Sequence, residues 1–488
     1  MALSDIQKTA HMLRRFGLGA SEAELDFYGS GTYEEAIDKF IKVSLEEPPQ
    51  LIDPQDFANG QGVVNIRVMQ GLWYARLCIS NQPLREKLTI FWHDHFAVGA
   101  NKVTSAFAMN QYVDVMRRLA LGSFQELLTE VSRSPAMIYW LDGQDNVAGR
   151  AQENFGREVL ELFTLGIGNY TEKDVQESAR AFTGWSYLGA SSRGASRPPG
   201  RQATFAYRAD QHDTGEKVVL GKRGEMTGNE VLDLLCDEPR TALYISEKLW
   251  KWFVSPTLST ATHNSIAQVF VNSKLSIAAL VKHMMLHPEF TSQANERSIV
   301  KNPVDFCLAT ARALGVGTRM SSLLEAGKRN PQINEQNGTN IAMIRAVGPA
   351  FALLQSTSSM GMELMEPPDV AGWQSGLEWI TSATMTERIK WSENLWQGGQ
   401  ARPRANLGGN AGGNRGGVTI GIDPRPIFGT ATNPNQVADR ILSLFDAEVS
   451  PRTKAAMVKA ASDSDNLGND AVRLATKILF ASPEFQMM

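Results

Sequence analysis

The feature that most constrains this chain is an apolar spacing typical of amphipathic helices, which recurs along almost its whole length. Apolar residues that return every three or four positions line one face of an α-helix, whereas strands alternate with a period of two. The spacing predicts helices at 32–43, 64–79, 84–96, 106–121, 124–131, 152–165, 174–183, 228–235, 240–253, 264–270, 277–287 and 303–314. We therefore expect a mainly α protein, a large multi-helix single body with a small irregular excursion that contains β structure.

Two stretches rich in glycine interrupt the helical pattern. Residues 188–205 are rich in Gly, Ser, Pro and Arg and predict an irregular surface excursion, and KVVLGKRGE, which begins at Lys217, predicts a short hairpin. Residues 398–421 contain GGNAGGNRGG, which is typical of a loop, a lid or a strip that binds a protein partner. The predicted parts are amino-terminal helices at 1–186, the excursion at 187–226, further helices at 227–395, a Gly-rich loop at 396–425 and carboxyl-terminal helices at 426–488 that pack on the same body.

The composition predicts a chain that folds around its own core. Of the 488 residues, 43% are hydrophobic and 20% are charged, which is far from the composition of disordered chains. The formal net charge of -4 gives no overall attraction to nucleic acid or to anionic membranes, so the expected partner is a small molecule, a glycan or a protein. Cys78, Cys236 and Cys307 lie far apart without a CxxC pair and are expected to be buried thiols.

The sequence shows no targeting or membrane-spanning signal. Its first residues, MALSDIQKTAHMLRRFGLG, lack the apolar stretch of a signal peptide, and nowhere do about 18 apolar residues run together. We expect a soluble protein with no transmembrane segment, either cytoplasmic or in a form that lacks its export signal.

The segment FWHDHF places two histidines at the end of a predicted helix. At about 100° per residue, His95 falls on the apolar face with Phe91 and Trp92, whereas His93 points well away, so His95 is the histidine expected in the core. A buried histidine can be a core residue with one hydrogen bond, a metal ligand or a general acid or base, and these alternatives stay open. If the helix ends near His93, both imidazoles can converge, which favours a metal.

The segment ENFGREVLELFTLG carries a polar stripe made by Asn154, Glu158 and Glu161. Two carboxylates three residues apart can share a cation or raise the pKa of one of them. Arg157 offers a structural alternative, because it can pair with Glu153 or Glu161 four residues away. The Glu-x-x-Glu spacing lacks the histidine of the Glu-x-x-His pattern in carboxylate-bridged di-iron sites.

A third polar cluster lies in the loop ADQHDTG, where Asp210, His212 and Asp213 supply oxygen and nitrogen donors. Such a loop can provide metal ligands or a general base, and an ordinary Asx turn explains it equally well. A site of His, Asp and Glu side chains suits zinc, manganese or iron better than calcium.

Several segments taken together resemble the bacterial family called domain of unknown function 1800 (DUF1800). They cover nearly the whole chain and read HMLRRFGLG, LREKLTIFWHDHF, ENFGREVLELFTLGIGNYTEKDVQESARAFTGW, DQHDTGEKVVLG, YISEKLWKWFV, PPDVAGW and SPEFQ. The resemblance implies that the following residues occupy family motif positions: His93, His95, Glu153, Asn154, Arg157, Glu158, Glu161, Arg180, Trp185, His212, Asp213 and Trp373. The family carries no established general activity, so the resemblance implies no reaction.

The chain departs from the family pattern at two places. Relatives often read HP before the KLW helix and commonly read SPEF where this chain has His287-Pro288. Glu238-Pro239 stands at the first place, so neither a histidine there nor His287 has the support of the family. Many relatives are exported, whereas this chain shows no signal peptide, which leaves its compartment open.

The leading hypothesis is a metal-assisted hydrolase that acts on an envelope or extracellular substrate such as a glycan. The chain has no GxSxG, HExxH or Walker A motif and no GxGxxG after a strand, so the usual hydrolase and nucleotide-binding classes lose support. A divalent zinc, manganese or iron ion is expected among His93, His95, Glu158, His212 and Asp213. Glu161 is the expected general base, Arg157 and Arg180 the groups that steady the developing anion, and Trp185, Trp373 and Asn154 the substrate contacts.

Two other hypotheses stay open. The first is a noncatalytic binding or assembly protein, in which the polar motifs join helices and the Gly-rich loop binds a partner. The second is a metal-free glycosidase that uses Glu158 and Asp213, whose carboxyl groups would lie roughly 5 to 10 Å apart.

Overall fold

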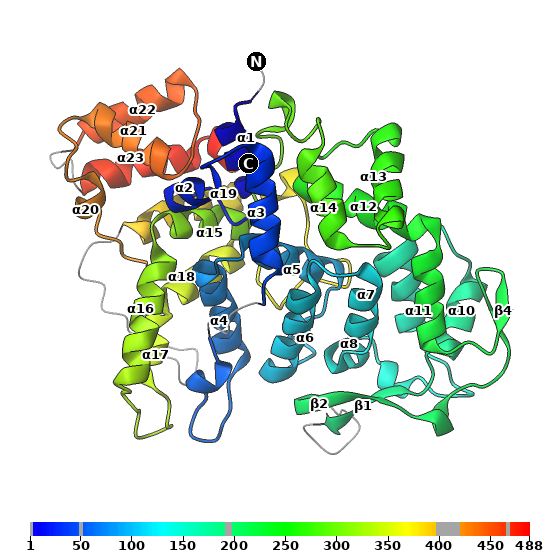
Figure 1. Ribbon diagram of the computed structural model, residues 1–488. Helices are drawn as coiled ribbons and strands as arrows, with labels where there is room; N and C mark the ends of the chain where they lie inside the picture. Colours follow the sequence, from blue (N-terminus) through cyan, green and yellow to red (C-terminus); the bar gives the residue numbers. More distant parts are fainter. Residues whose placement is uncertain (1–2, 48–51, 191–197, 397–419, 465–468) are drawn as a thin grey trace.

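The computed structural model describes residues 3–47, 52–190, 198–396, 420–464 and 469–488 (Figure 1). These residues form 23 α-helices and two antiparallel sheets of two strands each. Their buried apolar side chains form one continuous cluster that extends from Ala10 to Phe485. The expected mainly α single body is confirmed.

The amino-terminal part is entirely helical. It consists of α1 (Asp5–Phe16), α2 (Glu22–Tyr28), α3 (Tyr33–Leu45), α4 (Ile66–Ile79), α5 (Pro83–His95), α6 (Ala106–Leu119), α7 (Phe124–Ser132), α8 (Pro135–Trp140), α9 (Glu153–Glu158), a π-helix (Val159–Leu165) and α10 (Glu172–Ala181). Ser4, Ser21, Thr32 and Thr171 begin α1, α2, α3 and α10, and each forms a capping box with the residue three positions later. Such reciprocal hydrogen bonds satisfy backbone groups that the first helical turn leaves free.

The remaining elements begin with four strands. They are β1 (Trp185–Ala190), β2 (Pro199–Tyr207), β3 (Lys217–Val219) and β4 (Lys222–Gly224), followed by α11 (Gly228–Asp237), α12 (Pro239–Phe253), α13 (Thr260–Asn272), α14 (Ile277–Leu286), α15 (Pro303–Ala313), α16 (Val316–Arg329), α17 (Ile341–Ala346), α18 (Gly348–Ser359), α19 (Ser382–Leu395), α20 (Arg425–Phe428), α21 (Pro434–Leu444), α22 (Pro451–Ser462) and α23 (Asp470–Ala481). Helices α21 to α23 pack on one another, and α23 also packs on α19 (Figure 1).

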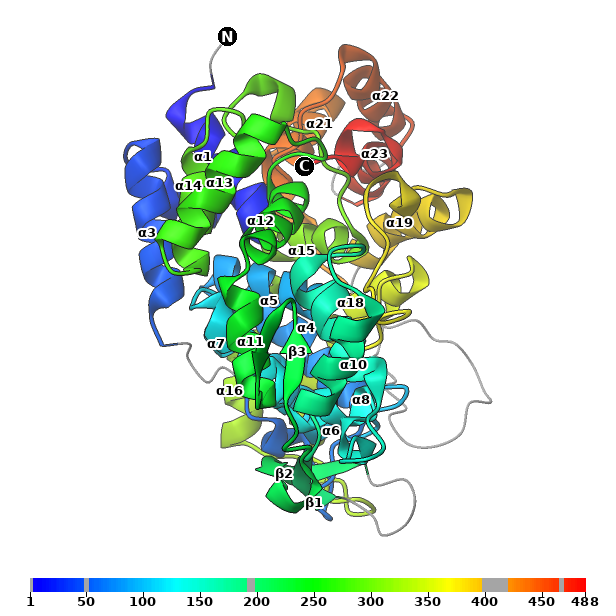
Figure 2. The ribbon, with the colours of Figure 1, turned by 90° about the vertical axis from the view of Figure 1, so that its right-hand side faces the viewer.

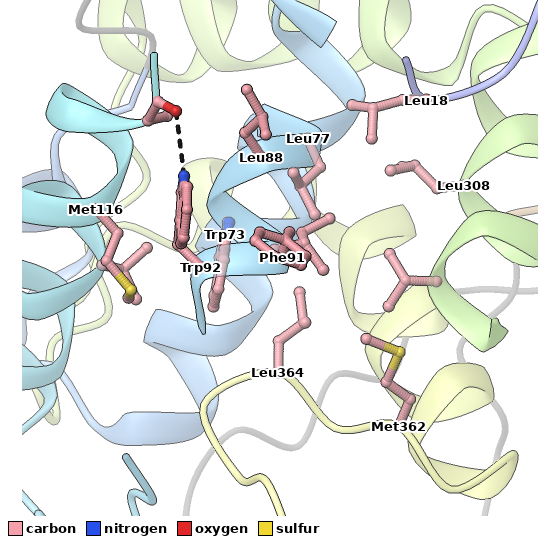
Figure 3. Close-up of a cluster of buried hydrophobic side chains, with 14 of the residues drawn as sticks. Leu18, Trp73, Leu77, Leu88, Phe91, Trp92, Met116, Leu308, Met362 and Leu364 are labelled. Carbon is pink, nitrogen blue, oxygen red and sulfur yellow. Dashed lines mark hydrogen bonds between the residues drawn. The ribbon is translucent and has the colours of Figure 1, made fainter. Parts of the chain in front are cut away.

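Helix α5 lies in the interior of the molecule (Figures 1 and 2). All 13 of its residues are buried, and Leu88, Phe91 and Trp92 lie among apolar side chains from several other segments (Figure 3). The indole N–H of Trp92 donates a hydrogen bond to the carbonyl of Ala120 at 3.1 Å. A helix covered on every side has no solvent face, so the charged and polar side chains of α5 must find their partners inside the protein.

The burial of α5 corrects one expectation about its histidines. His93 was predicted to point away from the core, but His93 is 0% exposed and His95 is 1% exposed. The prediction assumed a helix with one apolar face and one solvent face, and α5 has other elements on both sides. The helix also continues through His95, so the HDH tripeptide is helical and not part of a loop.

The β-containing excursion is more regular than expected. Strands β1 and β2 pair antiparallel, with Trp185 opposite Tyr207 and a register shift between Leu188 and Ala190. The prediction of an irregular segment at 188–205 is therefore wrong for the residues that belong to β1 and β2. Backbone pairing between these strands outweighs the Gly-rich and Pro-rich composition. The hairpin predicted at Lys217 is confirmed as β3 and β4, with Val219 opposite Lys222.

The Gly-rich loop predicted at 396–425 lies largely outside the described residues, which stop at 396 and resume at 420. Its predicted role in binding a protein partner therefore stays a prediction. Within the described ranges, no helix is both long enough and apolar enough to span a membrane.

Candidate functional site

The last turn of α5 places His95 beside the π-helix. Its Nε2–H donates to the carbonyl oxygen of Phe163 at 3.2 Å, and its ring lies 6.3 Å from that of Tyr244 on α12. Burial holds the pKa of His95 well below its usual value, and the nearby charge of Lys248 lowers it further. His95 is therefore a neutral imidazole, and its Nδ1 has no hydrogen-bond partner among the described residues.

His93 contacts a different part of the molecule, the loop that carries PPDVAGW. Its Nε2 accepts the backbone N–H of Met365 at 3.1 Å, and its ring lies 5.3 Å from those of both Trp73 and Trp373. Burial lowers the pKa of His93 to about 3, so this imidazole is also neutral. An accepting Nε2 carries no proton, which places the proton on Nδ1. The two histidines thus contact different elements and do not converge.

Asp94 lies between these histidines and is a buried acid. Its Oδ1 accepts the backbone N–H of Trp373 at 2.7 Å, and the residue is only 8% exposed. Burial raises the pKa of Asp94 to about 6, although the Trp373 N–H and the charge of Lys248 both act to lower it. We did not single out Asp94 from the sequence, although an acid beside an imidazole on a buried helix is a visible signal.

Lys248 on α12 is a second residue that the sequence analysis missed. Its ammonium lies 5.6 Å from the centre of the Tyr244 ring and takes part in no hydrogen bond or salt bridge within the described ranges. Burial lowers the pKa of Lys248, and the charge of Asp94 acts to raise it. The available signal was a lysine directly before Leu249 and Trp250, two residues that are fully buried on the same helix.

The predicted carboxylate stripe lies where α9 becomes a π-helix, directly after Glu158. The Thr164 hydroxyl donates to the carbonyl of Val159, five residues earlier, at 2.6 Å, which matches the wider turn of a π-helix. Glu161 accepts a hydrogen bond from the hydroxyl of Tyr170. Short π-helical segments are frequent at functional sites.

Glu158 is the unpaired member of this stripe. No hydrogen bond or salt bridge holds its carboxylate in the part of the chain that the structure describes. Burial raises the pKa of Glu158, and the neighbouring charge of Glu161 raises it further. The charge of Arg157 acts to lower this pKa, but its guanidinium pairs with Glu172 at 2.7 Å and with Glu153 at 3.2 Å and forms no salt bridge with Glu158 in the described ranges.

Tyr244 connects the carboxylates of the π-helix with the end of α5. It lies near His95 and Lys248, and the ring would be 3.0 Å from a Cβ placed on Gly166, directly after the π-helix. Burial raises the pKa of Tyr244 to about 12, and the charge of Glu161 is one of the smaller influences on it. We call five residues of α5, α9, the π-helix and α12 the α12 site: Asp94, Glu158, Glu161, Tyr244 and Lys248.

His212 and Asp213 belong to a separate cluster at the end of α10. The His212 Nδ1–H donates to the carbonyl of Thr183 at 2.9 Å, and the Asp213 N–H donates to the Thr183 hydroxyl at 2.8 Å. Arg180 binds Asp213 with two hydrogen bonds, at 2.8 and 3.0 Å, and a further one to Glu177. The Arg180 guanidinium is the main cause that holds the pKa of Asp213 below its usual value. These contacts fasten the DQHD loop to α10.

The predicted substrate contacts differ in their exposure. Trp185 is 4% exposed and packs against Phe155, Phe182 and Phe205, with ring centres 5.1 to 6.1 Å away. Trp373 is 8% exposed, and Asn154 is exposed. Two buried indoles have no free face on which a sugar ring can stack, so the stacking role predicted for them does not fit their surroundings.

The expected metal ligands do not fit a single ion. Within the described ranges, no three His, Cys, Asp or Glu side chains are grouped so that they could hold a metal. His93 and His95 each have one nitrogen without a partner, but these rings contact different elements, and Asp213 is bound by Arg180. A metal site needs at least three converging donors, so the expected set does not supply one.

The family comparison gives the chain its place among known proteins. Residues 11–487 match the family described as protein of unknown function (DUF1800). Neither the search of the curated proteins nor that of the solved structures found a match. Because the matched residues span nearly the whole chain, this protein belongs to the DUF1800 family, a family of unknown function.

Proposed function

We propose that this protein is a hydrolase in which Glu158 and Glu161 supply the acid and the base. The observation that carries the proposal is the pair itself, in which Glu158 is partly buried and unpaired and Glu161 is held by Tyr170. Burial and a second carboxylate favour the protonated form of Glu158, which a general acid requires. Two carboxyl groups with different environments are the usual machinery of glycoside hydrolysis, so the proposed substrate is a glycan of the envelope or the extracellular space.

In the proposed reaction, Glu161 accepts a proton from the attacking water and Glu158 donates a proton to the leaving-group oxygen. The hydrogen bond from Tyr170 orients the Glu161 carboxylate. The transition state of glycoside hydrolysis carries positive charge on the sugar ring, so the ammonium of Lys248 is assigned no contact with the substrate and acts only through the charge of Asp94. Arg157 and Arg180 are already engaged with carboxylates, so neither is assigned an anion-stabilising role.

A noncatalytic binding or assembly role is the second candidate. It is favoured by the contacts of Arg157, Arg180, His93, His95 and His212, each of which joins two segments of the same chain. Under this alternative, the protein has no catalytic activity, and substitutions in the α12 site change only the stability of the fold.

The test compares Glu158→Gln, Glu161→Gln and the matched control Glu325→Gln on a panel of glycans and chromogenic glycosides. We expect each of the first two variants to lose at least about 100-fold in kcat, because proton transfer is removed, with little change in Tm. Glu325 lies on α16 in an exposed pair with Arg329, outside the α12 site, so its variant keeps the activity. Full activity in Glu158→Gln, or a stoichiometric transition metal in the purified protein whose removal abolishes the reaction, would contradict the proposal. A fall in Tm without any detectable reaction would support the noncatalytic role.

A further inference from the structure

A second unusual cluster lies where α1, α5, α15 and α19 meet the segment 295–301. Its basic side chains are almost fully buried: Arg14 is 7%, Arg15 0%, Lys87 0%, Lys301 7% and Arg388 0% exposed. Isolated charges are costly to bury, so each of these needs a counter-charge, a neutral form or an unusual environment.

Carboxylates account for only some of these cations. Lys87 pairs with Asp305, and Arg14 pairs with Glu296 at 3.1 Å and with Asp446. Arg15, Lys301 and Arg388 have no salt bridge within the described ranges. Three buried cations therefore remain without a carboxylate of their own.

These three cations donate only to uncharged acceptors. Lys301 donates to the carbonyl of Phe485 at 2.9 Å, and Arg388 donates to Gln486 at 3.0 Å and to the carbonyl of Lys301 at 2.7 Å. Arg15 reaches the Ser298 hydroxyl at 2.9 Å. The Nε atoms of Arg14, Arg15 and Arg388 and the Nη1 of Arg15 are buried without a partner among the described residues.

A small cavity opens inside this cluster. Its volume is about 30 Å³, and its polar lining consists of Arg14, Lys301, Asp305 and Asp446. A space of this size accommodates one water-sized or halide-sized occupant. The two lining carboxylates already have cations, Lys87 and Arg14, so the unpaired charge on the wall is that of Lys301.

We propose that this cavity binds one small monovalent inorganic anion, such as chloride, against Lys301 and Arg14. The anion supplies the counter-charge that the buried side chains lack, and it joins α1 to the segment that leads into α15. The competing occupant is a water molecule that donates to Asp305 Oδ2, which has no partner in the described part of the chain. The surrounding arginines and burial lower the pKa of Lys301, and a bound anion reverses that effect.

The test measures Tm of the full chain in sodium chloride and in sodium gluconate at equal ionic strength. An occupied site raises Tm in chloride by about 1–3 °C relative to gluconate, and the effect saturates with concentration. Lys301→Met removes this difference, whereas the control Lys282→Met keeps it, because Lys282 lies on the surface in a pair with Asp38.

A second measurement does not depend on any variant. Crystals of the unaltered chain grown in sodium bromide give an anomalous peak in the cavity if an anion binds there. Equal Tm values in both salts and the absence of this peak would overturn the proposal and leave water as the occupant. An anomalous peak in the cavity, together with a Tm that is higher in chloride than in gluconate, supports the proposal.

Discussion

The carboxylate of Asp94 accepts the backbone N–H of Trp373 at 2.7 Å, which fastens the PPDVAGW loop to the last turn of α5. His93 fastens the same loop one residue earlier on α5, through the N–H of Met365. Two consecutive side chains of a buried helix thus hold one loop by its backbone. The loop and the α12 site share Asp94, so the position of the loop and the charge of the site are coupled.

Gly372 is required for this connection. A Cβ at this position would lie 2.4 Å from Asp94 Oδ1, and the backbone φ of +91° disfavours any other residue. We expect Gly372→Ala to lower the free energy of unfolding by about 3 kcal/mol or more, measured by urea denaturation. Gly168→Ala is the matched control, with a φ of +83° and nothing within 4 Å of its Cβ, and should cost about 1 kcal/mol. Equal costs in the two variants would refute the steric argument.

The ionisation of Asp94 makes stability depend on pH. Its folded pKa of about 6 lies above the ordinary 3.8, so between these values the folded state binds more protons than the unfolded state. The stabilisation that comes from this raised pKa is therefore fully present below about pH 4 and is lost as the pH rises through about 6. Over this range the free energy of unfolding falls by up to about 3 kcal/mol. Asp94→Asn keeps an acceptor for Trp373 and removes the charge, so its stability relative to the unaltered chain should improve from pH 4 to pH 7. A constant difference across this range would show that Asp94 ionises normally.

The pair of Arg180 and Asp213 holds the DQHD loop, and it should make stability depend on pH in the opposite direction. The folded pKa of Asp213 is lowered, so its stabilising effect is present above the unfolded pKa and is lost as the pH falls through the folded value. Both side chains are partly exposed, at 29% and 22%, which limits the interaction to about 1 kcal/mol. A double-mutant cycle with Arg180→Gln and Asp213→Asn at pH 7 measures it, and a coupling near zero would show that the other hydrogen bonds of the loop, such as those of Thr183, hold it without this ion pair.

The buried ion pair between Glu86 on α5 and Arg117 on α6 should be much more sensitive to substitution. Glu86 is 0% exposed in its side chain and pairs with Arg117 at 2.7 Å. Glu86→Leu leaves the Arg117 guanidinium buried without a counter-charge and should cost about 3–5 kcal/mol, and Arg117→Met in the same chain should recover part of it. The exposed pair of Arg329 and Glu325 is the control, where Glu325→Gln should change stability by less than about 0.5 kcal/mol. Chemical denaturation of these three variants decides the comparison.

Most helices between residues 32 and 314 were predictable, because the apolar spacing depends only on local sequence. Helix α6 begins at Ala106 as expected, and the π-helix ends at the predicted Leu165. The same reasoning failed for α5, because the spacing of one segment does not show how many neighbours cover it. It also missed the pairing of β1 with β2, which depends on residues that are distant in the sequence.

The candidate site was only partly predictable, for a related reason. Glu158 and Glu161 are neighbours on one helical segment, so their proximity follows from local sequence. Asp94 and Lys248 come together only when α12 packs near the end of α5, and no local pattern joins residues 154 positions apart. The expected approach of His95 to the DQHD loop stays a prediction, since the hydrogen bonds of these two residues go to other partners, His95 to Phe163 and His212 to Thr183.

The π-helix makes the number of residues in one short segment important. A π turn holds one residue more than an α turn, so removing a single residue from Val159–Leu165 would let the segment close as an ordinary α-helix. The flanking segments would keep their register, because the wider turn absorbs the extra residue, and the side chains within the turn would change direction. Glu161 lies inside this turn and Glu158 directly before it, so the two carboxylates would be placed differently relative to each other, although both glutamates would still be in the sequence. Relatives that lack one residue in this stretch are therefore expected to differ in chemistry even when their motifs look intact.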